Sequence, residues 1–302
     1  MKFNRSAGII LHPSSFPGPD GIGDLGPEAF QWIDFLVKSG CSLWQVLPLG
    51  PTGYGDSPYQ CFSAFAGNPY LISPTLLLDE QLLNRTDLAD RPEFSSKHIS
   101  YGEVISWKLT LLDRAYERFQ KSRKLAIKQE FAQFQVTNAD WLDDFALFMA
   151  IKESHGGGSW NQWPGELRQR QTSALRAVIK TNVASISRHK FRQFLFYRQW
   201  NALHAYAKQK GILIIGDVPI FVAYDSADAW SHPELFYINK LGLPSVVAGV
   251  PPDYFSPTGQ LWGNPLYRWQ VHANTGYAWW LSRFRSALHL LDYIRLDHFR
   301  GF

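Results

Sequence analysis

The chain has 302 residues, of which 45% are hydrophobic and 19% charged, and its formal net charge is +4. This composition is typical of a soluble globular protein with a sizeable core, and no apolar run approaches the roughly 18 residues of a membrane span. Scattered Lys and Arg residues argue against nucleic-acid binding, and two cysteines make no disulfide framework, so we expect a cytoplasmic protein.

The first 50 residues predict a strand, a helix and a second strand. Apolar runs over 7–12 and 42–49 read as buried strands, and a proline start and a glycine stop bound a helix over 27–38. A strand, a helix and a strand in about 40 residues predict a βαβ unit and therefore a parallel sheet. The predicted apolar side of the helix comprises Phe30, Ile33, Phe35, Leu36 and Val37.

The loop before this helix contains Gly21-Ile-Gly-Asp-Leu-Gly26, which matches the glycine pattern of dinucleotide-binding loops. That function needs the glycines directly after a strand and an acidic residue at the end of the next strand. Here a Pro-rich loop intervenes, and the run over 42–49 ends without an acid. We therefore expect the glycines to shape a loop, and we expect no nucleotide cofactor.

A dense loop over 50–60 follows the second strand and carries Tyr54, Ser57 and Tyr59. It is too rich in Gly and Pro for regular structure. Loops at the carboxyl ends of parallel strands are where α/β proteins place their sites. A plain surface turn would not need two tyrosines, so we favour a functional loop.

The apolar pattern over 71–186 predicts a mainly helical insertion after the second strand. A helix over 187–210, with aromatic side chains that we expect in the core, then leads back to the sheet. Apolar residues recur every four positions at Trp107, Leu111, Ala115 and Phe119, and again at Trp141, Phe145 and Met149.

A third apolar run over 211–222 places Asp217 where a strand ends, at the expected mouth of the sheet; a turn-capping role is the alternative. The segment over 244–267 then predicts a long loop without regular structure, and such loops are usually functional or disordered. This one is too aromatic for disorder. Its aromatic and amide side chains suit a polyhydroxylated ligand: Tyr254, Phe255, Gln260, Trp262 and Asn264.

After a Trp-rich helix over 276–289, a fourth strand carries Arg295, Asp297 and His298. Side chains two residues apart on a strand point to the same side, so Arg295 would lie beside Asp297 and favour its charged form. An ionised carboxylate at a strand end can act as a nucleophile, and a structural ion pair is the alternative. Because the three earlier predicted strands also end next to polar residues that suit a site, we favour the nucleophile role for Asp297.

Several long motifs resemble the 4-α-glucanotransferases, also called amylomaltases or disproportionating enzymes, which form glycoside hydrolase family 77. The resemblance covers the whole chain and implies an α/β fold, the TIM (β/α)8 barrel. Residues 1–302 would form the N-terminal half of this catalytic barrel, with roughly its first four strands and the insertion at about 71–186. The motifs include Gly8-Ile-Ile-Leu-His-Pro, Leu47-Pro-Leu-Gly-Pro-Thr-Gly-Tyr, Gly216-Asp-Val-Pro-Ile-Phe, Trp262-Gly-Asn-Pro-Leu-Tyr and Arg295-Leu-Asp-His-Phe.

The resemblance also implies a reaction, the retaining transfer of 4-α-glucan segments from a maltooligosaccharide or starch donor to the 4-OH of a glucose or glucan acceptor. Asp297 would be the nucleophile that forms a covalent glucosyl-enzyme intermediate, and Arg295 would orient it. No metal or cofactor is implied. A secondary glucan site would use Tyr54 and Tyr101. The expected substrate-binding residues are Ser57, Tyr59, Asp217, Tyr254, Phe255, Gln260, Trp262, Asn264 and His298.

In this family the acid–base glutamate and a further aspartate lie on later barrel strands, so we expect them beyond residue 302. A glycan-binding fragment without catalytic activity is therefore an alternative function. A metal-dependent hydrolase that uses His12, Asp217, Asp297 and His298 is another, but no typical metal-ligand spacing appears in the sequence.

Overall fold

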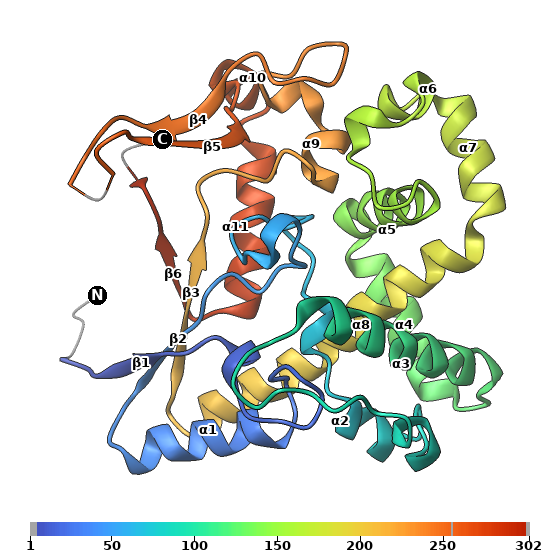
Figure 1. Ribbon diagram of the computed structural model, residues 1–302, viewed down its shortest axis with the longest axis vertical. Helices are drawn as coiled ribbons and strands as arrows, with labels where there is room; N and C mark the ends of the chain where they lie inside the picture. The colour runs from blue at the N-terminus through green and yellow to red at the C-terminus, as the bar shows by residue number, and fades with distance from the viewer. Residues whose placement is uncertain (1–4, 255, 300–302) are drawn as a thin grey trace.

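The computed structural model of the protein describes residues 5–254 and 256–299. Its main sheet has the strands β1 (Gly8–Ile10), β2 (Leu43–Gln45), β3 (Leu213–Val218) and β6 (Tyr293–Leu296). These strands are neighbours in the order β1-β2-β3-β6 and all pair in parallel, so the predicted parallel sheet is confirmed (Figure 1). No described helix is both long and apolar enough to cross a membrane.

Helices lie to one side of this sheet in Figure 1: α1 (Pro27–Lys38), α8 (Val183–Gln209) and α11 (Ala278–Leu290). The bounds of α1 agree with the prediction, because its proline start and glycine stop are local signals. Ile33 and Leu36 are fully buried, whereas Phe35 and Val37 are 51% and 41% exposed. The predicted apolar side was too wide, since the face of α1 that points inward holds residues three and four positions apart.

Helices occupy much of the chain between β2 and β3: α2 (Pro74–Asp79), α3 (Tyr101–Lys121), α4 (Leu125–Thr137), α5 (Ala139–Ser154), α6 (Gly165–Arg168) and α7 (Thr172–Thr181). Phe119 of α3, Phe131 of α4 and Phe191 of α8 form an aromatic cluster with ring centroids 4.5 to 5.7 Å apart. The cluster ties these helices to α8, which contacts the sheet. The core positions predicted for α3 are buried: Trp107, Leu111, Ala115 and Phe119.

The glycine motif over 21–26 shapes a crowded loop, as expected. A Cβ atom on Gly23 would lie 2.1 Å from the carbonyl oxygen of Pro13, so no larger residue fits there. Asp24 accepts a hydrogen bond from the buried ammonium of Lys108 at 3.0 Å, and Lys108 also donates to the carbonyl of Ile72. Through Lys108, the loop therefore connects α3 with the chain that precedes α1.

The prediction of an irregular loop over 244–267 was wrong. The segment contains β4 (Val247–Val250) and β5 (Gln260–Pro265), which pair antiparallel with an irregularity between Val247 and Gly249. The glycines and prolines that suggested a loop lie in and around this short, irregular hairpin. The short helices α9 (Ala227–Ser231) and α10 (Trp269–Asn274) flank it in the chain. Single turns of 3-10 helix are η1 (Pro13–Ser15), η2 (Tyr54–Asp56), η3 (Pro69–Leu71), η4 (Arg85–Leu88), η5 (Trp160–Gln162) and η6 (Pro233–Leu235).

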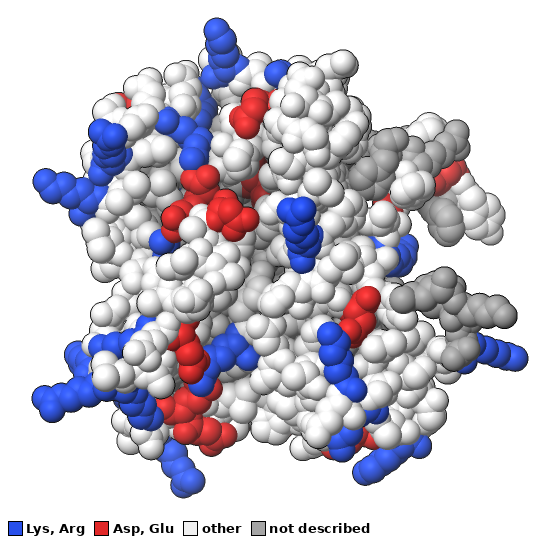
Figure 2. Space-filling view, turned by 180° about the vertical axis from the view of Figure 1, so that it is seen from behind, with Lys and Arg blue, Asp and Glu red and all other residues white. Residues whose placement is uncertain are grey.

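Basic and acidic side chains are interspersed on the face that Figure 2 shows, where Lys and Arg residues are spread over the surface rather than gathered in one patch. This distribution matches the scattering of charges along the sequence.

Candidate active site

A cleft of about 390 Å³ lies at the carboxyl ends of β3 and β6, between the loop after β2 and the hairpin β4–β5. We call it the candidate cleft. Most of the predicted site residues line it, although they come from three separate parts of the sequence. Its lining residues are Ser57, Tyr59, Gln60, Pro219, Ile220, Phe221, Gln260, Trp262, Asn264, Asp297 and His298.

Arg295 joins two carboxylates at the edge of this cleft. Its Nη2 atom donates to Oδ1 of Asp297 at 2.8 Å, which is the ion pair expected from their spacing. Its Nη1 atom donates to Oδ2 of Asp217 at 2.8 Å, a contact that the sequence analysis did not predict. The register of β3 and β6 makes Asp217 and Arg295 direct neighbours. A guanidinium presents its donors in a rigid fork, so one side chain fixes both carboxylates.

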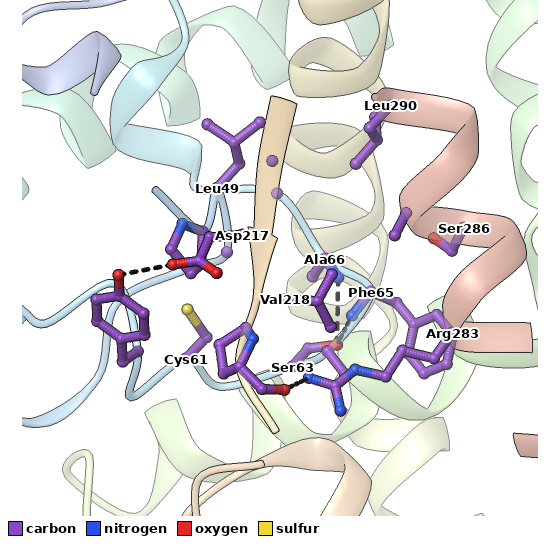
Figure 3. Close-up of a pocket in the computed structure, with 18 of the residues that line it drawn as sticks. Leu49, Cys61, Ser63, Phe65, Ala66, Asp217, Val218, Arg283, Ser286 and Leu290 are labelled. Atoms are coloured by element: carbon purple, nitrogen blue, oxygen red, sulfur yellow. Dashed lines mark hydrogen bonds between the residues drawn. The ribbon is translucent and has the colours of Figure 1, made fainter. Parts of the chain in front are cut away.

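Asp217 is not in the lining of the candidate cleft; with Tyr59 it lines a separate, smaller cavity of about 90 Å³, the pocket in Figure 3. The Asp217 side chain has no exposed surface, and Oδ2 also accepts a hydrogen bond from the Tyr59 hydroxyl at 2.9 Å (Figure 3). Burial raises the pKa of Asp217, and the nearby charge of Asp297 adds to this, while hydrogen bonds from Tyr59 and Arg295 oppose it. Burial and the bond to Asp217 raise the pKa of Tyr59 to about 12, so its hydroxyl stays a donor at neutral pH.

The nucleophile candidate sits in a turn directly after β6. His298, the next residue, has a φ of 47°, in the left-handed region that few non-glycine residues adopt. Such a conformation costs on the order of 1–3 kcal/mol and persists where the surroundings enforce it. Here it places the imidazole ring 4.7 Å from the Trp262 ring and Nε2 3.5 Å from Oδ2 of Asp297.

The hairpin contributes polar and aromatic groups to the opposite wall. Trp262 donates from Nε1 to Oε1 of Gln260 at 3.0 Å, and Asn264 donates to the carbonyl of Val222 at 2.8 Å. Gln60 donates to Oδ1 of Asn264 at 3.3 Å, which connects the loop after β2 with β5. Gln60 was not predicted as a site residue, although it follows Tyr59 directly in the dense loop.

Tyr254 and Tyr101 are not among the residues that line the candidate cleft. Tyr254, between β4 and β5, is 96% exposed, and Phe255 lies outside the described residues. Tyr54 begins η2, and Tyr101 begins α3, where burial and the charge of Asp56 raise its pKa. Tyr101 is therefore near η2, and the secondary glucan site stays a prediction.

The metal-site alternative required His12 to join the carboxylates. His12 instead lies at the start of η1, where Nδ1 is 2.7 Å from Oγ of Ser14, and burial lowers its pKa to about 4. Among residues 5–254 and 256–299, no group of three or more His, Cys, Asp and Glu side chains is arranged to hold a metal ion.

Comparisons with known sequences and with solved structures identify relatives of the same kind. A 4-alpha-glucanotransferase of Thermus thermophilus is 51% identical over 302 residues, and one of Synechocystis is 50% identical over 303 residues. Each alignment covers 100% of this chain and 60% of the relative, so the chain spans three fifths of the length of these relatives. The solved amylomaltase from Streptococcus agalactiae in complex with acarbose matches with a TM-score of 0.94 at 39% identity, over 99% of this chain and 60% of that one. The sequence model described as 4-alpha-glucanotransferase matches residues 11–302, and the chain therefore belongs to this family, glycoside hydrolase family 77.

Proposed function

We propose that the protein is a 4-alpha-glucanotransferase that moves 4-α-glucan segments from a maltooligosaccharide or starch donor to the 4-OH of a glucose or glucan acceptor. One observation carries the proposal: Arg295 holds Asp297 and Asp217 at the ends of neighbouring parallel strands, beside a cleft with aromatic and amide walls. Flat aromatic faces and amide groups suit sugar rings and their hydroxyls. Membership of the family supports the same activity.

We also propose that the sheet is part of a (β/α)8 barrel, with residues 1–302 as its N-terminal half and 71–186 as a helical insertion. The four strands pair in parallel in chain order, and the candidate site lies at their carboxyl ends, as in barrels of this kind. The similarity to a solved amylomaltase also supports the barrel.

In the proposed reaction, the Asp297 carboxylate attacks the anomeric carbon of the donor, and the bond to the leaving oxygen breaks as the glucosyl ester forms. Arg295 holds Oδ1 of Asp297, which leaves Oδ2 on the side of His298 for the attack. The leaving oxygen takes a proton from an acid–base carboxyl, which then accepts the proton of the acceptor hydroxyl as that hydroxyl attacks the ester. Two displacements give net retention.

The cleft residues would hold the glucose unit at the cleavage point. Asp217 fixes the Tyr59 hydroxyl, so the Tyr59 ring has one orientation for stacking on the sugar. Trp262 and His298 offer a second face, and polar contacts would come from Ser57, Gln260 and Asn264. Tyr254 and Phe255 would cover the bound glucan from the loop between β4 and β5. Since Asp217 has no exposed side-chain surface, we assign it the orientation of Tyr59 and Arg295.

The activity is tested by incubating the protein with maltotriose and measuring the release of glucose together with longer maltooligosaccharides. We expect transfer by a protein that also contains the acid–base glutamate of the later strands, and its loss in Asp297→Asn, which keeps the shape but removes the nucleophile. Asp90→Asn, at an exposed carboxylate that does not line the candidate cleft, is the matched control. Transfer that survives in Asp297→Asn would contradict the assigned nucleophile.

A second candidate function is glycan binding without transfer. Retaining transfer needs two carboxyl groups about 5–5.5 Å apart, and among the described lining residues Asp297 supplies the one carboxylate. Calorimetric titration with acarbose separates the two functions. Saturable binding of acarbose by a protein that transfers nothing would favour the binding function.

A further inference from the structure

Arg283 is a buried cation on α11 whose partners are unusual. It is 3% exposed, and its guanidinium lies over the rings of Trp280 and Trp279, at 4.8 and 5.5 Å from their centroids. Nη2 donates to the carbonyl of Pro219, and Nη1 lies 3.2 Å both from the carbonyl of Ile220 and from the hydroxyl of Tyr267. Its hydrogen-bond acceptors in the described structure thus include two backbone carbonyls and no carboxylate.

The end of β3 explains why a cation is placed here. The strand ends at Val218, so the next two carbonyls have no partner in the ladder with β6, and a buried carbonyl needs a donor. Burial of a guanidinium is costly unless hydrogen bonds replace its hydration. An apolar side chain would fill the same space at lower cost, but it would leave the carbonyl of Pro219 without its donor and the carbonyl of Ile220 with Tyr267 alone. The forked guanidinium donates a hydrogen bond to each of the two carbonyls at the same time.

The segment that Arg283 holds is continuous with the candidate site. Pro219, Ile220 and Phe221 line the candidate cleft, and Asp217 precedes them on β3. Tyr267 reinforces the same point, because its hydroxyl donates to the carbonyl of Ile220 at 2.8 Å. Figure 3 shows Arg283 extending from α11, with its hydrogen bond just beyond Val218.

We propose that Arg283 is a positioning residue for the transfer reaction, which sets the path of residues 219–221 and thereby the place of Asp217. Asp217 in turn holds Tyr59 and Arg295, so α11 is connected to the nucleophile through backbone carbonyls. This inference rests on the proposed function. Arg283 touches neither the candidate cleft nor the reacting atoms, and it acts through β3.

The test compares Arg283→Lys with Arg285→Lys in the intact protein. Lysine keeps the charge and the stem, but one ammonium cannot reproduce the fork that reaches both carbonyls. We expect Arg283→Lys to lower kcat/KM for maltotriose by about 10- to 100-fold, mainly through kcat, because small misplacements of a site have effects of this order. Arg285, two residues further on α11, is exposed, and its replacement should leave kcat/KM unchanged.

A double-mutant cycle with Tyr59→Phe distinguishes positioning from a general loss of stability. If Arg283 acts through Asp217 and Tyr59, the two substitutions together should cost less than the product of their separate effects, by about threefold or more. Independent effects, or an unchanged kcat/KM in Arg283→Lys, would overturn the inference.

Two further measurements keep the test decisive. If Arg283→Lys does not fold, Tyr267→Phe removes one donor to Ile220 with little change in shape, and it should lower kcat/KM by about 3- to 10-fold; no change would overturn the inference. If the wild-type protein shows no transfer, the proposed function is contradicted. The positioning role of Arg283 is then tested by measuring the binding of acarbose. Weaker binding in Arg283→Lys than in Arg285→Lys supports positioning, and equal binding contradicts it.

Discussion

The aromatic cluster of α3, α4 and α8 and the candidate cleft use buried groups in opposite ways. In the cluster, Phe119, Phe131 and Phe191 pack ring against ring and leave no polar group to satisfy. At the cleft, Asp217 is buried with one oxygen that has no hydrogen-bond partner among the described residues, and His298 holds a left-handed backbone. Such features cost stability and are typical of functional sites. Stability and proposed chemistry therefore reside in different parts of this chain.

The largest effect on stability is expected in the aromatic cluster. Phe191 is fully buried, so Phe191→Ala should lower the free energy of unfolding by about 3–5 kcal/mol, through lost burial and the cavity left behind. Urea denaturation measures this change, and Phe35→Ala, at a half-exposed position of α1, is the control, with an expected cost of less than about 1 kcal/mol. A similar cost at both positions would show that the cluster is not a special source of stability.

The reverse pattern is expected at Arg295. Arg295→Lys keeps the positive charge but cannot hold Asp297 and Asp217 together, so kcat for maltotriose should fall by about 100-fold. Because the Arg295 side chain is half-exposed, the thermal unfolding midpoint should change little. Steady-state kinetics and a thermal melt on the same sample test both parts. A large loss of stability at unchanged kcat would reverse the comparison.

A pH dependence should distinguish the buried carboxylate of the site. Burial raises the folded-state pKa of Asp217 above its ordinary value of 3.8, so the folded protein holds this proton more tightly than the unfolded chain. Stability from this group is therefore lost as pH rises from about 3.8 through the raised pKa. The Asp217→Asn variant has no such proton to lose. The difference between its free energy of unfolding and that of the wild type should therefore increase as pH rises over this range, while its transfer activity is lower. A gap that shrinks as pH rises would refute the assignment.

Glu153 on α5 should give the opposite pH dependence of the free energy of unfolding. Its effect should be the smallest of those predicted here. The close His189 ring, with Nε2 3.4 Å from Oε2 of Glu153, lowers the folded-state pKa of Glu153 below its ordinary value of 4.5, and the hydrogen bond from Ser185 and the charge of Arg188 add to this. Its contribution is present above pH 4.5 and is lost as pH falls through the lowered pKa. Since Glu153 is half-exposed and screened, Glu153→Gln should cost about 0.5 kcal/mol at pH 7 and nothing in strong acid. Urea denaturation at several pH values measures the cost at neutral pH and its disappearance in acid.

The sequence predicted the local features of the fold and of the site well. The bounds of α1 follow from residues within the helix and next to it, and the Arg295–Asp297 pair follows from a spacing of two on one strand. The pairing of Arg295 with Asp217 depends on the register of two strands that are far apart in the sequence, which no local pattern contains. The hairpin β4–β5 was missed for a similar reason, because its pairing overrides the loop propensity of its glycines and prolines.

The long connection between β2 and β3 has a consequence for how the chain folds. Leu43 pairs with Leu213, yet the whole of α2 to α8 comes between them in the sequence. Contacts between such distant residues form slowly, because a large loop must be closed first. We expect the helices between these strands to gain protection first in pulsed hydrogen exchange, and β3 and β6 to gain it last. Asp297 and Arg295 would then meet Asp217 in one of the final steps of folding, so any intermediate that accumulates would have an ordered helical region and no assembled site.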